Sequence, residues 1–249
     1  MGWIKIIALI VLLLGPSACG KSREVLKKEA SIHYDLGSVH LREGNLPRAL
    51  RELTPAVEKY PDNAIYHNAL GFAYFENDMN QDAIRHFKRA IEIDKEFSEA
   101  HINLSAVYLG EERWDDAIDE TNKAISNIFY TTPEFAYLNR GRGYYEKAEY
   151  KKAIEDFKRS IKANSRYVLA YYNLGLAYKK IERYRDAKAA FNILLKYAPN
   201  NIDAHYNLGL IYLKVRDNEN AKREFKEVIR IFPEGDLARS SREYVELLK

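Results

Sequence analysis

The sequence predicts an all-α fold: a right-handed superhelical solenoid of six helix–turn–helix repeats, closed by a C-terminal capping helix. One pattern returns six times along the chain, with starts at residues 30, 64, 98, 134, 168 and 202, so the steps are 34, 34, 36, 34 and 34 residues. Position 20 of every copy is alanine, and position 8 is glycine in five copies and serine in the third. A fixed period of this length is typical of stacked helical repeats, which bury a continuous core between neighbours.

Residues 1–18 differ from all that follows, and they predict a signal peptide. Lys5 supplies a positive start, and Ile6–Leu14 is a continuous apolar run that is too short to span a bilayer. The only cysteine of the chain, Cys19, follows small residues, an order that resembles the signal of bacterial lipoproteins. That resemblance implies a lipidated Cys19 that holds the protein to a membrane, although Pro16 departs from the usual pattern. An ordinary signal peptide followed by an incidental cysteine is the alternative.

A short charged tether, residues 19–29 including the cysteine, leads into the repeats and is expected to be helical near its end. In each repeat, positions 4, 7, 8 and 11 form one apolar stripe at helical spacing, and positions 17, 20, 24 and 27–28 form another. Small residues at positions 8 and 20 let the two helices approach closely, and a large residue at position 24, such as Phe87 or Phe191, fills the neighbouring gap. The six predicted repeats are residues 30–63, 64–97, 98–133, 134–167, 168–201 and 202–235.

Two segments depart from the repeat pattern. Ser126–Glu134 carries two extra residues between the third and fourth repeats, which predicts a bulged loop or a local change in the superhelical step. Residues 236–249 predict one amphipathic helix, with Arg239, Arg242 and Glu243 at positions that pack in the true repeats. We therefore expect a capping helix, since the terminal unit of a solenoid needs a polar outer face.

The period, the small positions and the proline that ends the second helix in three copies resemble the tetratricopeptide repeat (TPR) over Ala30–Gly235. Six such repeats behind a lipoprotein signal, with the insertion Tyr130-Thr131-Thr132-Pro133-Glu134 before the fourth, resemble the type IV pilus biogenesis lipoproteins, or pilotins (PilF, PilW and Tgl). This resemblance implies an outer-membrane lipoprotein on the periplasmic face that helps the pilus secretin to localise and assemble. The alternative is a general periplasmic TPR lipoprotein that scaffolds another cell-envelope assembly machine.

Composition and the remaining motifs do not predict a nucleic-acid-binding, metal-binding or catalytic site. The 39 basic and 36 acidic residues are interspersed, so the net charge of +3 does not predict a nucleic-acid binder. Four of the six histidines occupy position 4, which predicts packing between helices and not metal ligation, because successive first helices lie roughly 9 Å apart. No sequence pattern typical of a phosphate-binding loop or a catalytic nucleophile is found. We therefore expect no enzymatic activity, no cofactor, no metal and no small-molecule substrate.

The predicted function is protein binding through the concave face. In this repeat type the first helices line that face through positions 2, 5, 9 and 12, and 17 of these 24 positions are apolar or aromatic. Because a contiguous apolar groove marks a partner site, we expect an apolar or amphipathic protein segment to bind there. The alternative is that superhelical curvature buries much of the stripe. The predicted groove residues are Tyr34, Leu41, Ile65, Phe72, Phe75, Ile102, Ala106, Leu109, Phe135, Leu138, Tyr145, Leu169, Tyr172, Leu176, Tyr206, Leu210 and Leu213.

Overall fold

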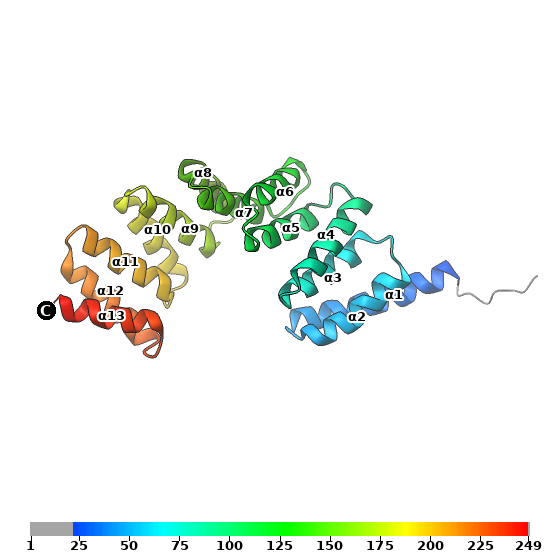
Figure 1. Ribbon diagram of the computed structural model, residues 1–249, viewed down its shortest axis with the longest axis horizontal. Coiled ribbons are helices and arrows are strands. Elements are labelled where there is room, and N and C mark those ends of the chain that lie inside the picture. Colours follow the sequence, from blue (N-terminus) through cyan, green and yellow to red (C-terminus); the bar gives the residue numbers. More distant parts are fainter. Residues whose placement is uncertain (1–21, 249) are drawn as a thin grey trace, which may run out of the picture.

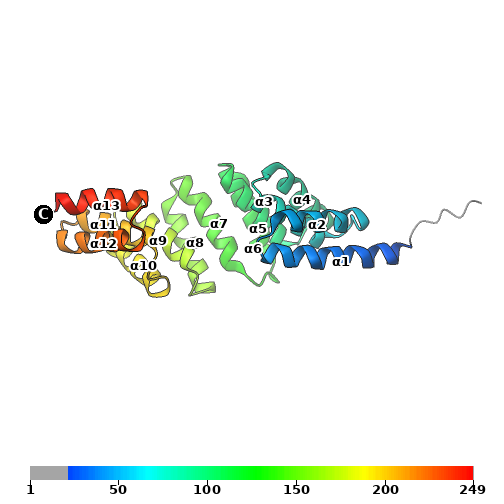
Figure 2. The ribbon, with the colours of Figure 1, turned by 90° about the horizontal axis from the view of Figure 1, so that it is seen from below.

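The computed structural model describes residues 22–248, within which the chain forms thirteen α-helices and no strand. The helices stack along an arch, with α1 at one end, α13 at the other and α6 and α7 near the middle (Figure 1). Turned by 90°, the same helices form one elongated row (Figure 2). The predicted all-α solenoid is confirmed. The helices are α1 (Arg23–Arg42), α2 (Leu46–Lys59), α3 (Ala64–Glu76), α4 (Asn80–Ile93), α5 (Ser98–Gly110), α6 (Trp114–Ser126), α7 (Pro133–Glu146), α8 (Tyr150–Ala163), α9 (Val168–Lys180), α10 (Tyr184–Tyr197), α11 (Ile202–Lys214), α12 (Asn218–Ile231) and α13 (Asp236–Leu247).

Each repeat is one helix pair held together by a small residue against a large one. A Cβ atom added to Gly71 would lie 2.8 Å from the ring of Phe87, and one added to Gly175 would lie 2.7 Å from the ring of Phe191. Both rings are fully buried, as are all six alanines at position 20. The predicted contact between positions 8 and 24 is therefore confirmed: the ring occupies the space that the glycine leaves free.

A three-residue turn joins the two helices of each repeat, and its middle residue is left-handed. This residue is glycine only in the first repeat, where Gly44 has φ +70°. An L-residue is less stable in this conformation by roughly 1–2 kcal/mol, so five turns hold a strained residue. The other middle residues, with φ between 57° and 60°, are Asp78, Glu112, Ala148, Glu182 and Arg216.

The first helix is longer than the sequence indicated. α1 begins at Arg23, so most of the expected tether is helical and continues without a break into the first repeat. Glu29 in this stretch pairs with Lys59 at 2.8 Å, which holds it against α2. The predicted signal peptide and Cys19 lie outside the described residues. Among the helices that the structure describes, none is long and apolar enough to cross a membrane.

Helix α13 covers the C-terminal end of the arch, as predicted. Its Tyr244 stacks on Phe225 of the last repeat, with 4.7 Å between the ring centroids, and Ala238 and Ser241 are buried. Arg239, Arg242 and Glu243 are exposed on the other side. This helix therefore gives one end of the solenoid the polar surface that a terminal unit needs.

The predicted insertion forms a six-residue loop, 127–132, whereas each of the other connections between repeats has four residues. Its tip is exposed: Ile128 keeps 87% and Phe129 79% of their accessible surface. Tyr130 instead turns inward and packs against the core cluster that contains Ile102. The loop is anchored by the side-chain amide of Asn127, which donates to the carbonyl oxygen of Glu96 at 2.9 Å. The bulged loop is thus confirmed.

Candidate partner-binding groove

The inner helices α1, α3, α5, α7, α9 and α11 carry the predicted groove residues, but not all of these side chains reach solvent. Ile102, Leu109 and Leu138 are buried, with 8%, 4% and 4% exposure, so Leu109 and Leu138 offer almost no surface to a partner, and Ile102 offers only the edge that lines the hollow described below. Each belongs to a core cluster: Tyr130 packs on the first, Phe72, Phe75 and Trp114 on the second, and Tyr145 and Tyr172 on the third. Neighbouring aromatic side chains therefore cover the stripe at these three points.

The other predicted groove residues remain accessible to different degrees. Ile65, Phe135 and Leu169 are exposed, at 52%, 41% and 50%. The remainder are half-buried, as expected for side chains that pack against a neighbour and still offer one edge to solvent. They are Tyr34, Leu41, Phe72, Phe75, Ala106, Tyr145, Tyr172, Leu176, Tyr206, Leu210 and Leu213.

The structure brings part of this set together in one hollow on the inner side of the second to fourth repeats. The hollow has a volume of about 520 Å³, and most of its lining surface is apolar. It continues into a second hollow of about 370 Å³ on the first repeats, since Asn68, Phe72 and Asn103 line both. The first is lined by Asn68, Phe72, Phe75, Glu99, Ile102, Asn103, Ala106, Tyr130, Thr132, Phe135 and Asn139, and the second by Tyr34, Ser38, Leu41, Arg42, Asn68, Ala69, Phe72 and Asn103. This apolar groove across the first four repeats is the candidate site.

One wall of the groove comes from the insertion, which the sequence analysis did not place there. Tyr130 and Thr132 line the hollow beside Phe135, whose ring meets Tyr167 edge-on at 5.4 Å between centroids. Burial raises the pKa of Tyr130 to about 12, although a hydrogen bond with Thr132 lowers it in part. A phenol held in this way stays neutral and presents an apolar ring face with one polar group.

The polar groups of the groove favour a ligand that is not acidic. The side-chain amide of Asn103 donates to the amide oxygen of Asn68 at 2.9 Å, and that of Asn139 donates to the Ser105 hydroxyl at 2.9 Å. Both N–H groups of Asn139 are used internally, towards Ser105 and the carbonyl oxygen of Ile102, so its amide oxygen is left to accept a hydrogen bond. The amide oxygen of Asn103 can also accept, while Asn68 keeps its N–H groups as donors. The carboxylate of Glu99 lies on the same hollow. Backbone N–H donors or a basic side chain would suit this lining better than a carboxylate.

In the second half of the arch, several predicted groove residues support the core instead. Tyr172 meets Phe191 edge-on at 6.0 Å, and Tyr206 meets Phe225 at 5.8 Å between centroids. Burial lowers the pKa of Lys179, whose amino group donates to the amide oxygen of Asn207 on the next inner helix at 2.6 Å. These aromatic residues therefore rest on the large position-24 side chains of their own repeats.

The histidines at position 4 pack between helices, as predicted, but each also has a hydrogen-bond partner at position 23. His205 donates from Nδ1 to Glu224 and from Nε2 to the carbonyl oxygen of Pro199. Burial alone would lower the pKa of His205, yet these two hydrogen bonds and the negative charges of Glu224 and Glu227 together raise the pKa. Within residues 22–248, no three His, Cys, Asp or Glu side chains are grouped as a metal site would need. The Nδ1 contacts are His33–Glu52 at 2.8 Å, His67–His86 at 3.0 Å, His101–Glu120 at 2.5 Å and His205–Glu224 at 2.7 Å.

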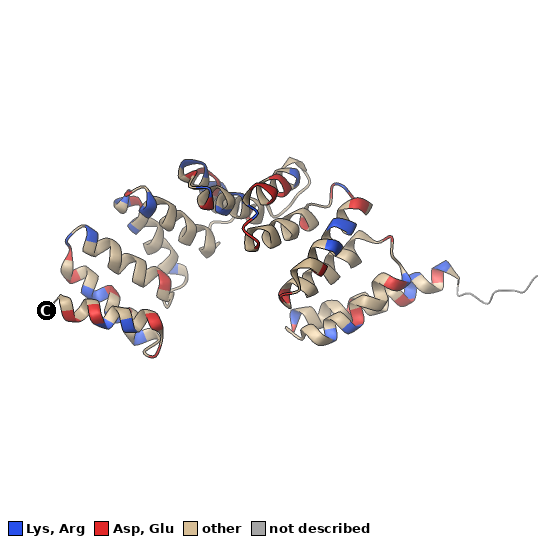
Figure 3. Cartoon of the chain, viewed as in Figure 1, with Lys and Arg blue, Asp and Glu red and all other residues tan. Residues whose placement is uncertain are grey.

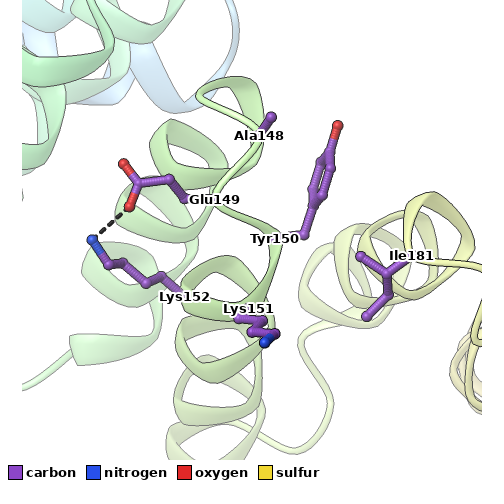
Figure 4. A pocket seen from close by; sticks show the side chains of 6 residues that line it. All are labelled: Ala148, Glu149, Tyr150, Lys151, Lys152 and Ile181. Carbon is purple, nitrogen blue, oxygen red and sulfur yellow. Dashed lines mark ion pairs between the residues drawn. The ribbon is translucent and has the colours of Figure 1, made fainter.

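Another hollow, of about 400 Å³, lies on the turns of the fourth and fifth repeats (Figure 4). Ala148, Tyr150 and Ile181 form its apolar side, while Lys152 points back to Glu149 and pairs with it at 2.5 Å. Across the whole arch, Lys and Arg are interspersed with Asp and Glu (Figure 3). The hollow on the turns lies outside the groove, and Lys151 also lines it.

Comparisons with known proteins agree with this architecture. A family model described as tetratricopeptide repeat matches residues 34–96 and 175–236, and one described as TPR repeat matches residues 141–182. The solved structure of pilF from Pseudomonas aeruginosa is similar, with 17% identity, a TM-score of 0.77 and coverage of 90% of this chain and 99% of that one. PilW, described as a widely conserved type IV pilus biogenesis factor, has 19% identity, a TM-score of 0.80 and coverage of 85% and 97%.

A curated relative extends the likeness to a plant protein. The CTR9 homolog of Arabidopsis thaliana is 24% identical over 131 residues, which are 52% of this chain. The match spans only 12% of the Arabidopsis protein. At the identities of the two solved structures, the likeness shows a shared fold.

Proposed function

Since the chain belongs to the tetratricopeptide-repeat proteins, which generally act as protein-interaction scaffolds and not as enzymes, we propose that it is a type IV pilotin. In this role it is a lipoprotein of the outer membrane, anchored through Cys19 on the periplasmic face. Its groove binds a protein segment, and the complex assists the localisation and assembly of the pilus secretin. The protein acts without a cofactor or a small-molecule substrate.

The observation that carries this proposal is the apolar groove across the first four repeats. Phe72, Phe75 and Phe135 are the aromatic side chains of the predicted set that line its larger hollow, whose volume of about 520 Å³ suits several side chains of a bound segment. An amphipathic helix or an extended strand can place apolar side chains into such a groove and its backbone N–H groups near Asn103 and Asn139. The partner is therefore a protein segment of apolar or amphipathic character.

Two further observations support the pilus role. The likeness to pilF and PilW extends over nearly the full length of those chains, and one of them is described as a pilus biogenesis factor. The insertion Tyr130–Glu134, which marks the resemblance in the sequence, supplies Tyr130 and Thr132 to the wall of the groove. Anchoring through several acyl chains on Cys19 would be stable, because a single chain binds a membrane only marginally.

The test is made in the native organism. The gene is deleted, and the denaturant-resistant secretin multimer is measured in the outer-membrane fraction, beside a strain that carries Cys19→Ser. We expect the multimer to disappear in the deletion strain and to be lost or misplaced in the Cys19→Ser strain. A multimer that is unaffected by the deletion would refute the pilotin role. The alternative, a scaffold for another envelope assembly machine, would then be pursued by crosslinking in cells.

Groove variants separate the binding site from the fold. Phe72→Ala and Phe75→Ala remove half-buried rings that line the groove, so both proteins should fold while secretin multimers decrease. Leu169→Ala is the matched control, because Leu169 is 50% exposed on inner helix α9 and does not line the hollow. If Leu169→Ala reduced the multimer as much as Phe72→Ala, the groove of the first four repeats would not be the binding site.

A further inference from the structure

The two ends of the solenoid differ in the polarity of their outer surfaces. The C-terminal end is covered by α13, whose outer positions carry Arg239, Arg242 and Glu243. The N-terminal end is the outer face of α1, and there four large apolar side chains are exposed. They are Val25 at 45%, Ile32 at 51%, Leu36 at 47% and Val39 at 39%. The exposed end face of a solenoid is normally polar, so the apolar outer face of α1 is unusual for a terminal unit.

These four side chains lie on one side of the helix. Their spacings of seven, four and three residues return to the same face at 3.6 residues per turn, and the stripe is about 21 Å long at a rise of 1.5 Å per residue. The opposite side of α1 carries the buried residues Ala30 and Gly37, which pack against α2. The stripe therefore points away from the solenoid, in the pattern of a helix that packs along a second helix.

The charges beside the stripe indicate what covers it. Glu24, Lys28, Asp35 and Arg42 all border the same edge of the stripe, all are exposed, and none takes part in an ion pair among the described residues. In an antiparallel pair of α1 helices centred on Ile32, residue i faces residue 64 − i. Lys28 then lies beside Asp35 of the second copy, and Glu24 lies beside Arg42 of the second copy. The two-fold symmetry repeats each of these contacts, so both contacts occur twice in the dimer. Each of the four charges lies beside an opposite charge and not beside the same residue of the second copy.

From this self-complementarity we propose that the outer face of α1 is a homodimer interface, in which two copies of this chain pair their α1 helices antiparallel about a two-fold axis at Ile32. In this arrangement Val25 meets Val39 of the second copy and Ile32 meets its own equivalent, with the helix axes about 8–10 Å apart. The inference is independent of the proposed pilus role, because it uses only the outer face of α1.

A lipid surface fits the same face less well. The edge of the stripe carries two carboxylates, Glu24 and Asp35, beside two cations, Lys28 and Arg42, so it has no net positive charge with which to attract an anionic membrane. One helix face of four half-exposed side chains is smaller than the roughly 800 Å² per partner of a standard stable interface. The dimer is therefore weak and reversible, which fits a contact that assembles at high local concentration.

Cysteine crosslinking distinguishes antiparallel pairing from every other arrangement. The full chain carries Cys19→Ser, so that an introduced cysteine is the only thiol, and it is oxidised with copper phenanthroline in detergent solution. Ile32→Cys should form a disulfide-linked dimer, because this position faces itself across the two-fold axis. Val25→Cys alone should not, whereas Val25→Cys combined with Val39→Cys should crosslink. Lys226→Cys, exposed on α12 at the far end of the arch, is the control and should stay monomeric.

A charge exchange provides an independent readout. Lys28→Asp places two carboxylates together twice in each dimer and should weaken dimerisation on the order of tenfold in analytical ultracentrifugation. The double variant Lys28→Asp with Asp35→Lys restores opposite charges and should recover the original affinity. Both positions are exposed, so circular dichroism should be unchanged.

The opposite results would overturn the proposal. Crosslinking of Val25→Cys alone at the level of Ile32→Cys would indicate a parallel pair. Equal crosslinking of Lys226→Cys would indicate unspecific association in detergent. A protein that carries Ile32→Cys and remains monomeric at several hundred micromolar would show that no second copy covers this face.

Discussion

The pair of His67 and His86 should make the second repeat sensitive to acid, in contrast to the equivalent pairs elsewhere in the chain. Nε2 of His67 donates to the carbonyl oxygen of Pro61 at 3.0 Å, so in the neutral ring Nδ1 carries no proton and must accept. His86 therefore donates from its own Nδ1 across 3.0 Å, and its ring also stacks on Tyr74. A proton added to Nδ1 of His67 places two donors at this contact, and one added to Nε2 of His86 places a positive charge in a largely buried ring.

The pKa of His86 gives the size of the effect. Burial, and then the proximity of His67, lower it from 6.5 to about 4, and burial also lowers the pKa of His67. The unfolded chain thus binds more protons than the folded chain below pH 6.5, so the free energy of unfolding falls as the pH falls from 6.5 towards 4. For His86 alone, the loss between pH 7 and pH 5 is about 1.8 kcal/mol, and solvent screening of this partly exposed ring reduces it to roughly 1 kcal/mol.

His86→Glu reverses the sign. It copies the His205–Glu224 pair, in which the histidine also donates from Nε2 to the carbonyl oxygen before it and has a raised pKa. A histidine with a raised pKa stabilises the fold fully below its unfolded pKa of about 6.5, and this contribution is lost as the pH rises through the folded value. The variant should therefore gain stability, relative to the parent, by roughly 1 kcal/mol or more between pH 7 and pH 5.

The assay is urea unfolding followed by circular dichroism at pH 5, 6, 7 and 8, for the parent, His86→Glu and His86→Gln. His86→Gln keeps a donor to His67 and removes one titrating group, so it should flatten the pH dependence without reversing it. The reasoning is refuted if the parent and His86→Glu lose the same free energy between pH 7 and pH 5, because the site would then have no part in the acid response.

Three further substitutions test the packing that the fold depends on. Gly175→Ala forces a methyl group to within 2.7 Å of the buried ring of Phe191 and should lower the free energy of unfolding by about 1–3 kcal/mol. Gly110→Ala adds a methyl group with nothing within 4 Å and should raise the free energy of unfolding slightly. Equal effects of the two variants in urea unfolding would contradict this packing. Ala148→Gly relieves a left-handed residue with φ 57° and should add about 0.5–1 kcal/mol, measured in the same way, and a loss would show that the turn is not strained. Asp156→Ala removes the buried carboxylate that holds Arg140 through two hydrogen bonds and should cost about 3 kcal/mol; a change within 0.5 kcal/mol would show that water replaces the carboxylate.

The repeat pattern predicted the helix pairs because its strongest constraint is local. Glycine at position 8 and a ring at position 24 lie only 16 residues apart, and their contact needs one turn between two helices. The partners at position 23 were missed because they vary: glutamate faces His205, a second histidine faces His67, and alanine stands at Ala190 opposite Tyr171. A polar pair between helices leaves no periodic signal when either member can change.

Exposure along the concave face was harder to predict, because it depends on how neighbouring repeats meet. Ile102 stands at position 5 of the third repeat, Leu109 at position 12 of the same repeat, and Leu138 at position 5 of the fourth. The repeat pattern predicts all three as groove residues because it treats every repeat alike. In the structure each belongs to a core cluster against which partly buried aromatic side chains pack. The rotation between consecutive repeats decides such contacts, and that rotation is not encoded in any single position of the pattern.

The insertion shows how a change of two residues acts on the site. Each of the other connections between repeats has four residues, whereas the one between the third and fourth repeats has six. Tyr130 of the longer loop packs against the cluster that contains Ile102 and lines the hollow together with Phe135. Tyr130 therefore forms one wall of the groove at the point where Ile102 is buried. Ile128 and Phe129, at the exposed tip of the same loop, lie outside the groove. The insertion that distinguishes this chain from a regular TPR array thus lines the apolar hollow on the concave face, which is why the groove of the first four repeats is the site to test.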